Sequence, residues 1–252
     1  MKLLVVANWK CNPTNLQEAK KLFNSVERRV KEIQKVEVVI CPPFVYLSNI
    51  QHLKSNIQLG AQDCFWEEKG AFTGEISPAM LKDLGVDYVI IGHSERRKYL
   101  KETDEMVNKK LRAVLKAGLK AILCVGSIQR GKNGEREMSR QLEKALFGVK
   151  KSDLENIVFT YEPIWAISTT RGSAVATPEN TKEGAIFIRK TLFKLFNNSP
   201  QIKIIYGGSV DGSNIRGFIE RAEMDGVLIG AASLKAEDFI AAVKNIDKLR
   251  KT

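Results

Sequence analysis

The chain has 252 residues, 44% of them hydrophobic and 27% charged, with a formal net charge of +11. This composition supports a large core, excludes a disordered protein, and contains no apolar run near the roughly 18 residues of a membrane span. The charge suggests nucleic acid as a partner, but basic and acidic residues are interleaved, as between Glu27 and Glu32. Solvated helix faces explain the charge better, and a positive field would also attract a small anionic substrate.

The cysteines and the first residues indicate a cytoplasmic protein. The four cysteines form no Cys-x-x-Cys pair, and only two histidines accompany them, so we expect reduced thiols and no metal site. Five apolar residues, Leu3–Ala7, are too few for the hydrophobic region of a signal peptide.

Eight short β-prone runs alternate with helical stretches along the chain. The predicted strands are Leu3–Ala7, Val36–Ile40, Ile57–Ala61, Tyr88–Ile91, Ala121–Val125, Ile157–Tyr161, Ile202–Tyr206 and Gly226–Ile229. The predicted helical faces are Ala19, Leu22, Phe23, Val26, Val30 and Ile33 in the first helix, and Phe239, Ile240, Val243 and Ile246 in the last. Thr14 with Gln17 predicts a capping box for the first helix, and Thr177 before Pro178 predicts another helix start.

The alternation of strands and helices predicts a parallel sheet. Eight such units within 252 residues favour a single α/β domain, residues 1–252, in which the sheet closes into a (β/α)8 TIM barrel. Functional groups of such a barrel lie where the strands end, and phosphate binds after strands seven and eight.

Chemically useful residues stand at five of these strand ends. They are Asn8 and Lys10, His93, Glu162, the Gly207–Val210 segment, and the Gly230–Ser233 segment. Alone, each has an ordinary explanation: a surface lysine, a structural histidine, a solvated glutamate or a tight turn. Together on one rim they place a carboxylate and an imidazole beside two loops whose backbone N–H groups can approach an oxyanion.

Five segments in the same order resemble the triosephosphate isomerase family over nearly the whole chain. They are Asn8-Trp9-Lys10, Ala71 to Glu75, Gly92 to Arg97, Tyr161 to Ile167, and Tyr206 to Val210. The resemblance implies cofactor-free interconversion of dihydroxyacetone phosphate and D-glyceraldehyde 3-phosphate through an enediolate.

The resemblance also implies the role of each residue. Glu162 matches the base, His93 the electrophile, Lys10 the neighbouring cation, and Asn8 a second polar contact. Ser168, Ser209, Gly230 and Ala231 are expected to bind the phosphate, with Glu95 and Cys124 in support. A base acting beside a carbonyl needs an oxyanion stabiliser opposite it, and this family is itself the usual example of a glutamate base with a neutral histidine.

Some positions differ from the family pattern. Ser168 replaces a usual glycine, Ser127 a usual glutamate and Ala231 a usual glycine, and the residues from Thr169 to Val175 are atypical. We expect the segment from Pro163 to Thr177 to form a lid that excludes water from the enediolate. We expect these differences to affect closure of the lid and binding of the phosphate.

The resemblance further implies a homodimer, in which the loop containing Phe72, Thr73, Gly74 and Glu75 inserts into a partner subunit beside Lys10. We expect no nucleic-acid and no membrane partner. Three alternative functions remain: another sugar-phosphate isomerase with a barrel fold, a basic nucleic-acid-binding protein, and a catalytically inactive barrel that serves as an interaction protein.

Overall fold

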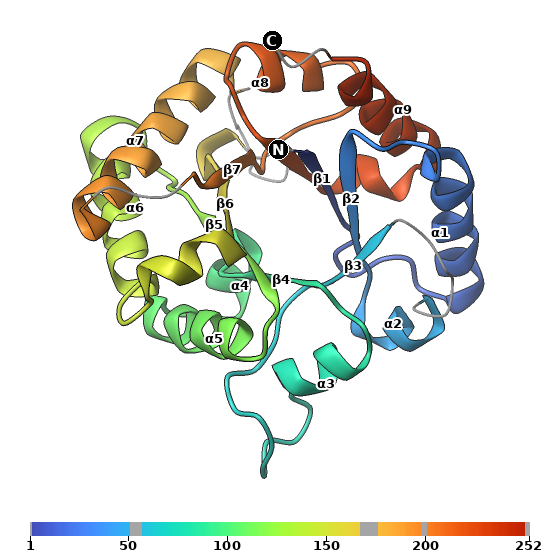
Figure 1. Cartoon of the computed structure of the whole chain (residues 1–252), viewed down its shortest axis with the longest axis horizontal. Coiled ribbons are helices and arrows are strands. Elements are labelled where there is room, and N and C mark those ends of the chain that lie inside the picture. The colour runs from blue at the N-terminus through green and yellow to red at the C-terminus, as the bar shows by residue number, and fades with distance from the viewer. Residues whose placement is uncertain (1, 51–56, 167–175, 198–200, 250–252) are drawn as a thin grey trace.

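The computed structural model describes residues 2–50, 57–166, 176–197 and 201–249. In this part of the chain, eight parallel strands close into one barrel in chain order, with β8 paired to β1 (Figure 1). The strands are β1 Leu3–Asn8, β2 Val36–Cys41, β3 Gln58–Ala61, β4 Tyr88–Ile91, β5 Lys120–Val125, β6 Ile157–Tyr161, β7 Lys203–Tyr206 and β8 Gly226–Ile229. The predicted (β/α)8 TIM barrel is confirmed.

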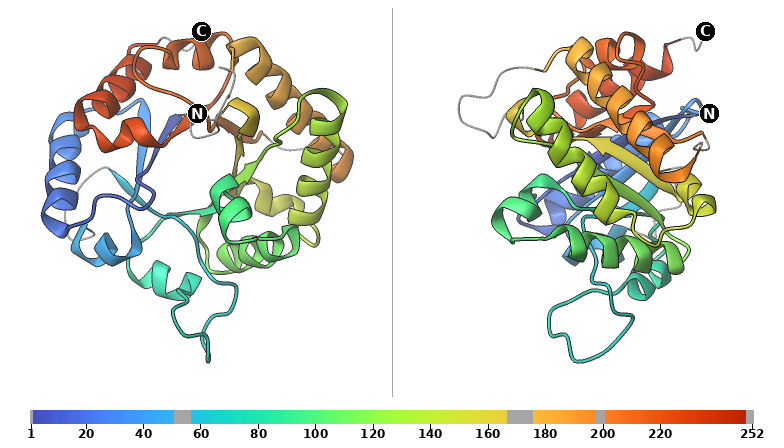
Figure 2. Two further views of the ribbon diagram at one scale, coloured as in Figure 1. Left: turned by 180° about the vertical axis from the view of Figure 1, so that it is seen from behind. Right: turned by 90° about the vertical axis from the view of Figure 1, so that its left-hand side faces the viewer.

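Helices surround the barrel on its outer side, as the views from behind and from the side show (Figure 2). They are α1 Leu16–Val30, α2 Phe44–Ile50, α3 Pro78–Asp83, α4 Ser94–Tyr99, α5 Asp104–Lys116, α6 Gly131–Ala145, α7 Pro178–Phe196, α8 Ile215–Glu220 and α9 Ala236–Asp247. Short 3-10 turns cover Lys151–Asn156, Ile164–Ala166 and Ala231–Leu234. Among the described residues, no helix is both long and apolar enough to cross a bilayer.

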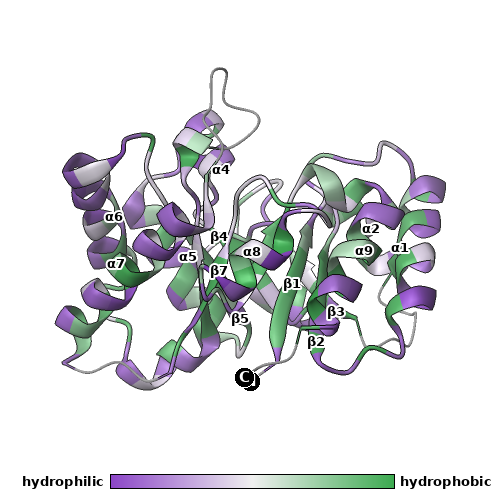
Figure 3. Ribbon diagram, turned by 90° about the horizontal axis from the view of Figure 1, so that it is seen from above, coloured by the Kyte–Doolittle hydropathy of each residue, from purple (hydrophilic) through white to green (hydrophobic). Residues whose placement is uncertain are grey.

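Alternate side chains of each strand point to opposite faces of the sheet, and both faces are buried. One face lies inside the barrel, and the helices cover the other. In β1, Leu4 and Val6 belong to an apolar cluster made only of strand residues, which fills the inside of the barrel. Leu3, Val5 and Ala7 belong to the larger cluster that joins the strands to the helices. Figure 3 shows the result: the strands are mostly hydrophobic, and hydrophilic residues concentrate on the helices.

The predicted strand bounds agree with the structure to within one residue, but the predicted start of the first helix is wrong. The N-cap of α1 is Asn15 rather than Thr14, and the Asn15 side chain accepts a hydrogen bond from the Glu18 N–H group. Leu16 packs against the core, which sets the first helical residue. The helix also ends earlier than its apolar pattern suggests, at Val30. Ile33, the last residue of that pattern, lies beyond the helix but still packs against the core.

The start of α7 and the buried face of α9 agree with the sequence predictions. Thr177 is the N-cap of α7, with Pro178 as its first residue, as predicted. The stripe of α9 is buried as predicted, at Phe239, Ile240, Val243 and Ile246.

Candidate active site

A cavity of about 690 Å³ opens where the strands end. It brings together eight of the predicted site residues: Asn8, Lys10, His93, Glu95, Glu162, Ser209, Gly230 and Ala231. They come from the ends of five strands, which is where the barrel topology predicts functional groups. Ser168 and the rest of the atypical segment up to Val175 lie outside the described residues.

Glu162 follows β6 and is only 3% exposed. One carboxylate oxygen, Oε1, lies 3.1 Å from Nε2 of His93. The other, Oε2, accepts a hydrogen bond of 3.0 Å from the Ser94 N–H group. A buried carboxylate at the cavity wall is therefore held by two donors from the start of α4.

His93 is the N-cap of α4. Its Nδ1 accepts a hydrogen bond of 3.2 Å from the Glu95 N–H group, so Nδ1 carries no proton. This contact assigns the proton of a neutral imidazole to Nε2, the atom that faces Glu162. His93 can thus donate a hydrogen bond into the cavity without carrying a positive charge.

Lys10 has an unusual backbone, with φ at 54°, which is uncommon for a residue other than glycine. Two contacts hold this conformation: the Lys10 N–H donates to Asn8 Oδ1 at 3.0 Å, and Gln62 Nε2 donates to the Lys10 carbonyl at 2.9 Å. The ammonium forms an ion pair with Glu95 Oε1 at 2.6 Å. Lys10 thus contributes a positive charge at the cavity, fixed from both its backbone and its side chain.

The turns after β7 and β8 approach the site closely because they contain glycine. A Cβ atom at Gly207 would lie 2.6 Å from the Thr160 side chain and 3.1 Å from Cγ of Glu162. A Cβ atom at Gly230 would lie 3.1 Å from Cε of Lys10. Side chains at these positions would press on the two charged groups, so the turns bring backbone rather than side chains next to them.

Cys124 lies on β5 and is fully buried. Burial and the nearby Glu162 carboxylate raise the pKa of its thiol well above the ordinary value. The thiol therefore stays protonated at neutral pH, and Cys124 is a packing residue beside Glu162 rather than a nucleophile.

Two contributors to the site were missed in the sequence. Gln62 directly follows β3 and donates hydrogen bonds to the carbonyls of Lys10 and Cys41, each at 2.9 Å. Its place at a strand end is the same signal that identified the other residues, and would have found it. The Ser94 N–H group, which binds Glu162, carries no signal of its own because every residue but proline has such a group.

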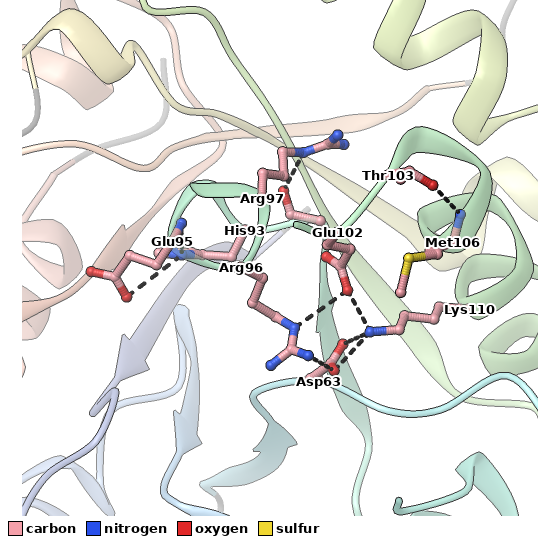
Figure 4. Close-up of polar contacts among 10 residues, drawn as sticks. Asp63, His93, Glu95, Arg96, Arg97, Glu102, Thr103, Met106 and Lys110 are labelled. Carbon is pink, nitrogen blue, oxygen red and sulfur yellow. Dashed lines mark hydrogen bonds and ion pairs between the residues drawn. The ribbon is translucent and has the colours of Figure 1, made fainter. Parts of the chain in front are cut away.

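A second group of charges lies behind α4, which we call the buried charge cluster: Asp63, Arg96, Glu102 and Lys110 (Figure 4). Lys110 Nζ lies 2.8 Å from both oxygens of Asp63 and also pairs with Glu102. Arg96 binds Asp63 at 2.7 Å and Glu102 at 3.3 Å. Since Arg96 belongs to α4, this cluster fastens the helix that carries His93 at its start.

The loop between β3 and α3 projects from the barrel (Figures 1 and 2). Phe72 in this loop is 43% exposed, and its ring centroid lies 4.8 Å from that of Phe65. Thr73, Gly74 and Glu75, the other residues of the predicted dimer loop, are also exposed.

Comparison with known proteins agrees with this geometry. The family model described as triosephosphate isomerase matches residues 3–246. Triosephosphate isomerase of Caldanaerobacter subterraneus subsp. tengcongensis is 47% identical over 95% of this chain and 98% of its own length. The enzymes of Clostridium tetani and Geobacter metallireducens are 46% and 43% identical, over 96% and 95% of this chain and 96% and 97% of their own lengths. The chain that carries this strand-end cavity, with its paired carboxylate and imidazole, therefore belongs over nearly its whole length to the triosephosphate isomerase family.

Proposed function

We propose that this isomerase interconverts dihydroxyacetone phosphate and D-glyceraldehyde 3-phosphate, with Glu162 as the base. The observation that carries the proposal is the approach of the Glu162 carboxylate to within 3.1 Å of His93 Nε2 at the wall of the cavity. A base and a hydrogen-bond donor so placed can act on a carbon and on the oxygen of the adjacent carbonyl.

The proposed reaction begins when Glu162 removes a proton from C1 of dihydroxyacetone phosphate. The Nε2–H group of His93 donates to the C2 oxygen, which takes up the negative charge of the enediolate. A proton then passes between the two oxygens by way of His93, and Glu162 returns its proton to C2. Atoms and electrons balance within the substrate, so the step consumes no other reactant.

The starting position of Glu162 determines what the substrate must displace. Its carboxylate accepts a hydrogen bond from the Ser94 N–H group and lies 3.1 Å from His93 Nε2. In this mechanism the substrate carbonyl replaces the carboxylate as the partner of His93. The freed oxygen of Glu162 then faces the carbon that loses the proton.

The substrate phosphate is proposed to bind at the turns that follow β7 and β8. Ser209, Gly230 and Ala231 of these turns line the cavity. Lys10 and Asn8 line the same cavity. The positive charge of Lys10 favours a dianionic substrate, and the backbone N–H groups supply donors for its oxygens.

The test is a coupled assay that follows formation of glyceraldehyde 3-phosphate from dihydroxyacetone phosphate. Wild-type enzyme should be active, and Glu162→Ala should lose at least about 10³-fold in kcat because the base is absent. Activity only on other phosphorylated sugars would contradict the proposed substrate. Wild-type kcat in Glu162→Ala would show that another group is the base.

We also propose that the chain forms a two-fold dimer through the projecting loop. Phe72 supports this, because an exposed aromatic ring on a protruding loop gains from burial in a partner. Light scattering at micromolar concentration should give twice the monomer mass, and Phe72→Ser should shift the mass toward the monomer. Phe147→Ser is the matched control, since Phe147 is 76% exposed but lies just after α6, outside the projecting loop. A fully active wild-type monomer would contradict the proposal.

We further propose a single domain spanning residues 1–252 that works in the cytoplasm. The four cysteines are free, which suits a reducing compartment. Cell fractionation tests the location. A single cooperative unfolding transition, with the same midpoint by fluorescence and circular dichroism, tests the single domain.

A further inference from the structure

The backbone on both sides of Glu162 rests on the turn that follows β5. The Glu162 N–H donates to the Val125 carbonyl at 2.8 Å, and the Ile164 N–H donates to the Ser127 carbonyl at 3.0 Å. Between them, a Cβ atom at Gly126 would lie 1.7 Å from the Glu162 carbonyl oxygen. The position of Glu162 is therefore set by the backbone of the Val125–Ser127 turn.

The centre of this turn is held by one side chain from α6. Oε1 of Gln141 accepts from the Gly126 N–H at 3.0 Å, and Nε2 of Gln141 donates to the Gly126 carbonyl at 2.8 Å. Gln141 is 3% exposed, so no bulk water competes for these bonds. An amide is suited to this task because it offers a donor and an acceptor side by side, as one backbone residue does.

The neighbouring residue is held from the same helix. The Ser127 hydroxyl donates to Oε2 of Glu137 at 2.6 Å and accepts from the Gln129 N–H at 2.9 Å. Ser127 is the position at which the sequence departs from the usual glutamate of its family. In this chain Glu137 of α6 binds the side chain at this position, so the turn is bonded to that helix at two successive residues, Gly126 and Ser127.

We propose that Gln141 is a positioning residue that acts on Glu162 through Gly126. It lines the cavity, but both of its polar atoms are bonded to Gly126, so its effect on the reaction passes through the turn and not through the substrate. The inference rests on the proposed role of Glu162 as the base. Proton transfer is sensitive to displacements of about 1 Å. Both hydrogen bonds of the Gln141 amide go to Gly126, next to the backbone of Glu162, so its loss should affect proton transfer more than phosphate binding.

The first experiment compares Gln141→Leu with Leu142→Ala. Gln141→Leu removes both bonds to Gly126, and should lower kcat about 10- to 100-fold with KM changed less than about threefold. Leu142 is fully buried on the same helix and has no part in the turn, so Leu142→Ala should lower the melting temperature but leave kcat near that of wild type. Equal kcat for wild type and a folded Gln141→Leu would overturn the proposal.

Gln141→Glu provides a second test that does not depend on Gln141→Leu folding well. A buried glutamate has a raised pKa, and its neutral acid again offers one donor and one acceptor to Gly126. Above that pKa, the carboxylate faces the Gly126 carbonyl and loses the donor bond. The ratio of kcat for Gln141→Glu to kcat for wild type should therefore rise as the pH falls, with the ratio correcting for protonation of Glu162 in both enzymes.

The charged residues that line the cavity with Gln141 are Lys10, Glu95, Arg97, Lys98, Glu137, Glu162 and Asp211. The carboxylates among them would raise the pKa of the introduced glutamate, and the lysines and the arginine would lower it. A ratio that is constant from pH 5.5 to 9 would show that the paired bonds to Gly126 do not matter. If Glu162→Ala proves fully active, the proposed function fails instead, whatever the Gln141 variants do.

Discussion

Two groups of charged side chains flank α4, and they serve different ends. On one side Lys10, Glu95, His93 and Glu162 line the cavity. On the other, the buried charge cluster of Asp63, Arg96, Glu102 and Lys110 lines no part of it. Both groups combine acids with bases at hydrogen-bond distance, and Figure 4 shows members of both around the same helix.

The difference between the two groups lies in what remains for a ligand. In the buried charge cluster two acids and two bases meet, so each charge finds its opposite within the protein. At the cavity, the Nε2–H of His93 and the carboxylate of Glu162 point at each other where a substrate can separate them. Paired charge thus holds a helix in one place and lines the candidate site in the other, because the buried charge cluster lines no part of this cavity.

The largest effect is expected from removing one partner of the buried charge cluster. Glu102→Ala leaves Lys110 and Arg96 with Asp63 alone, and should lower the free energy of unfolding by about 3–5 kcal/mol. Urea denaturation followed by tryptophan fluorescence measures this change. A loss below about 1 kcal/mol would mean that the cluster adds little to the fixing of α4.

Shortening the side chain of the proposed base should slow the reaction and leave the fold intact. Glu162→Asp withdraws the carboxylate by about 1 Å and should lower kcat by about 10²-fold, or about 2.7 kcal/mol of barrier, with KM nearly unchanged. Steady-state kinetics with the coupled assay give both constants, and a thermal melt serves as the control for folding. If Glu162→Asp lost stability but kept the kcat of wild type, Glu162 would serve the fold, like the buried charge cluster, and not the reaction.

Asp63 should make the stability of the buried charge cluster depend on pH. Burial, together with the neighbouring Glu102 carboxylate, raises the pKa of Asp63 to about 6, against the opposing effects of Lys110 and Arg96. The folded chain then holds this proton more tightly than the unfolded chain, in which the pKa is near 3.9. Protons therefore favour the folded form, and the contribution of Asp63 to stability falls as the pH rises from about 4 to 6.

Asp63→Asn isolates this dependence, because the amide keeps the shape but does not titrate. Urea denaturation of both proteins at pH 4.5, 5.5 and 7.5 should show the variant gaining on wild type as the pH rises, with no further gain above about pH 7. A difference that is independent of pH would show that Asp63 keeps an ordinary pKa.

The smallest effect is expected from an exposed pair on the helix next to α4. Glu105 pairs with Lys144 at 2.7 Å, but its side chain is 62% exposed. Water and salt screen such a pair, so Glu105→Ala should leave the urea midpoint unchanged within error. As the matched control for Glu102→Ala, it removes the same type of charge only three residues away. Equal losses in the two variants would show that burial is not what makes the cluster important.

The strand order and the contents of the rim could be predicted because both depend on local patterns. Eight apolar runs separated by helical stretches leave few ways to bury every strand on both faces, and closure in chain order is one of them. Since parallel strands all end at one edge, Lys10, His93 and Glu162 had to meet there, whatever the details of packing. The sequence pattern misplaced the start of α1, because it indicated Thr14 as the N-cap, whereas the helix begins after Asn15 with Leu16 packed against the core.

Only the tertiary structure decided how these groups touch. The hydrogen bond from Ser94 to Glu162 joins residues 68 positions apart, and its donor is a backbone group that every sequence contains. The proton position on His93, the role of Gln141 and the buried charge cluster likewise follow from distances of a few ångströms between separate elements. Sequence alone therefore determined which chemical groups share the rim, because strand direction is a property of the pattern. Three-dimensional packing determined their hydrogen-bond partners, because hydrogen bonds depend on tenths of an ångström that no pattern encodes.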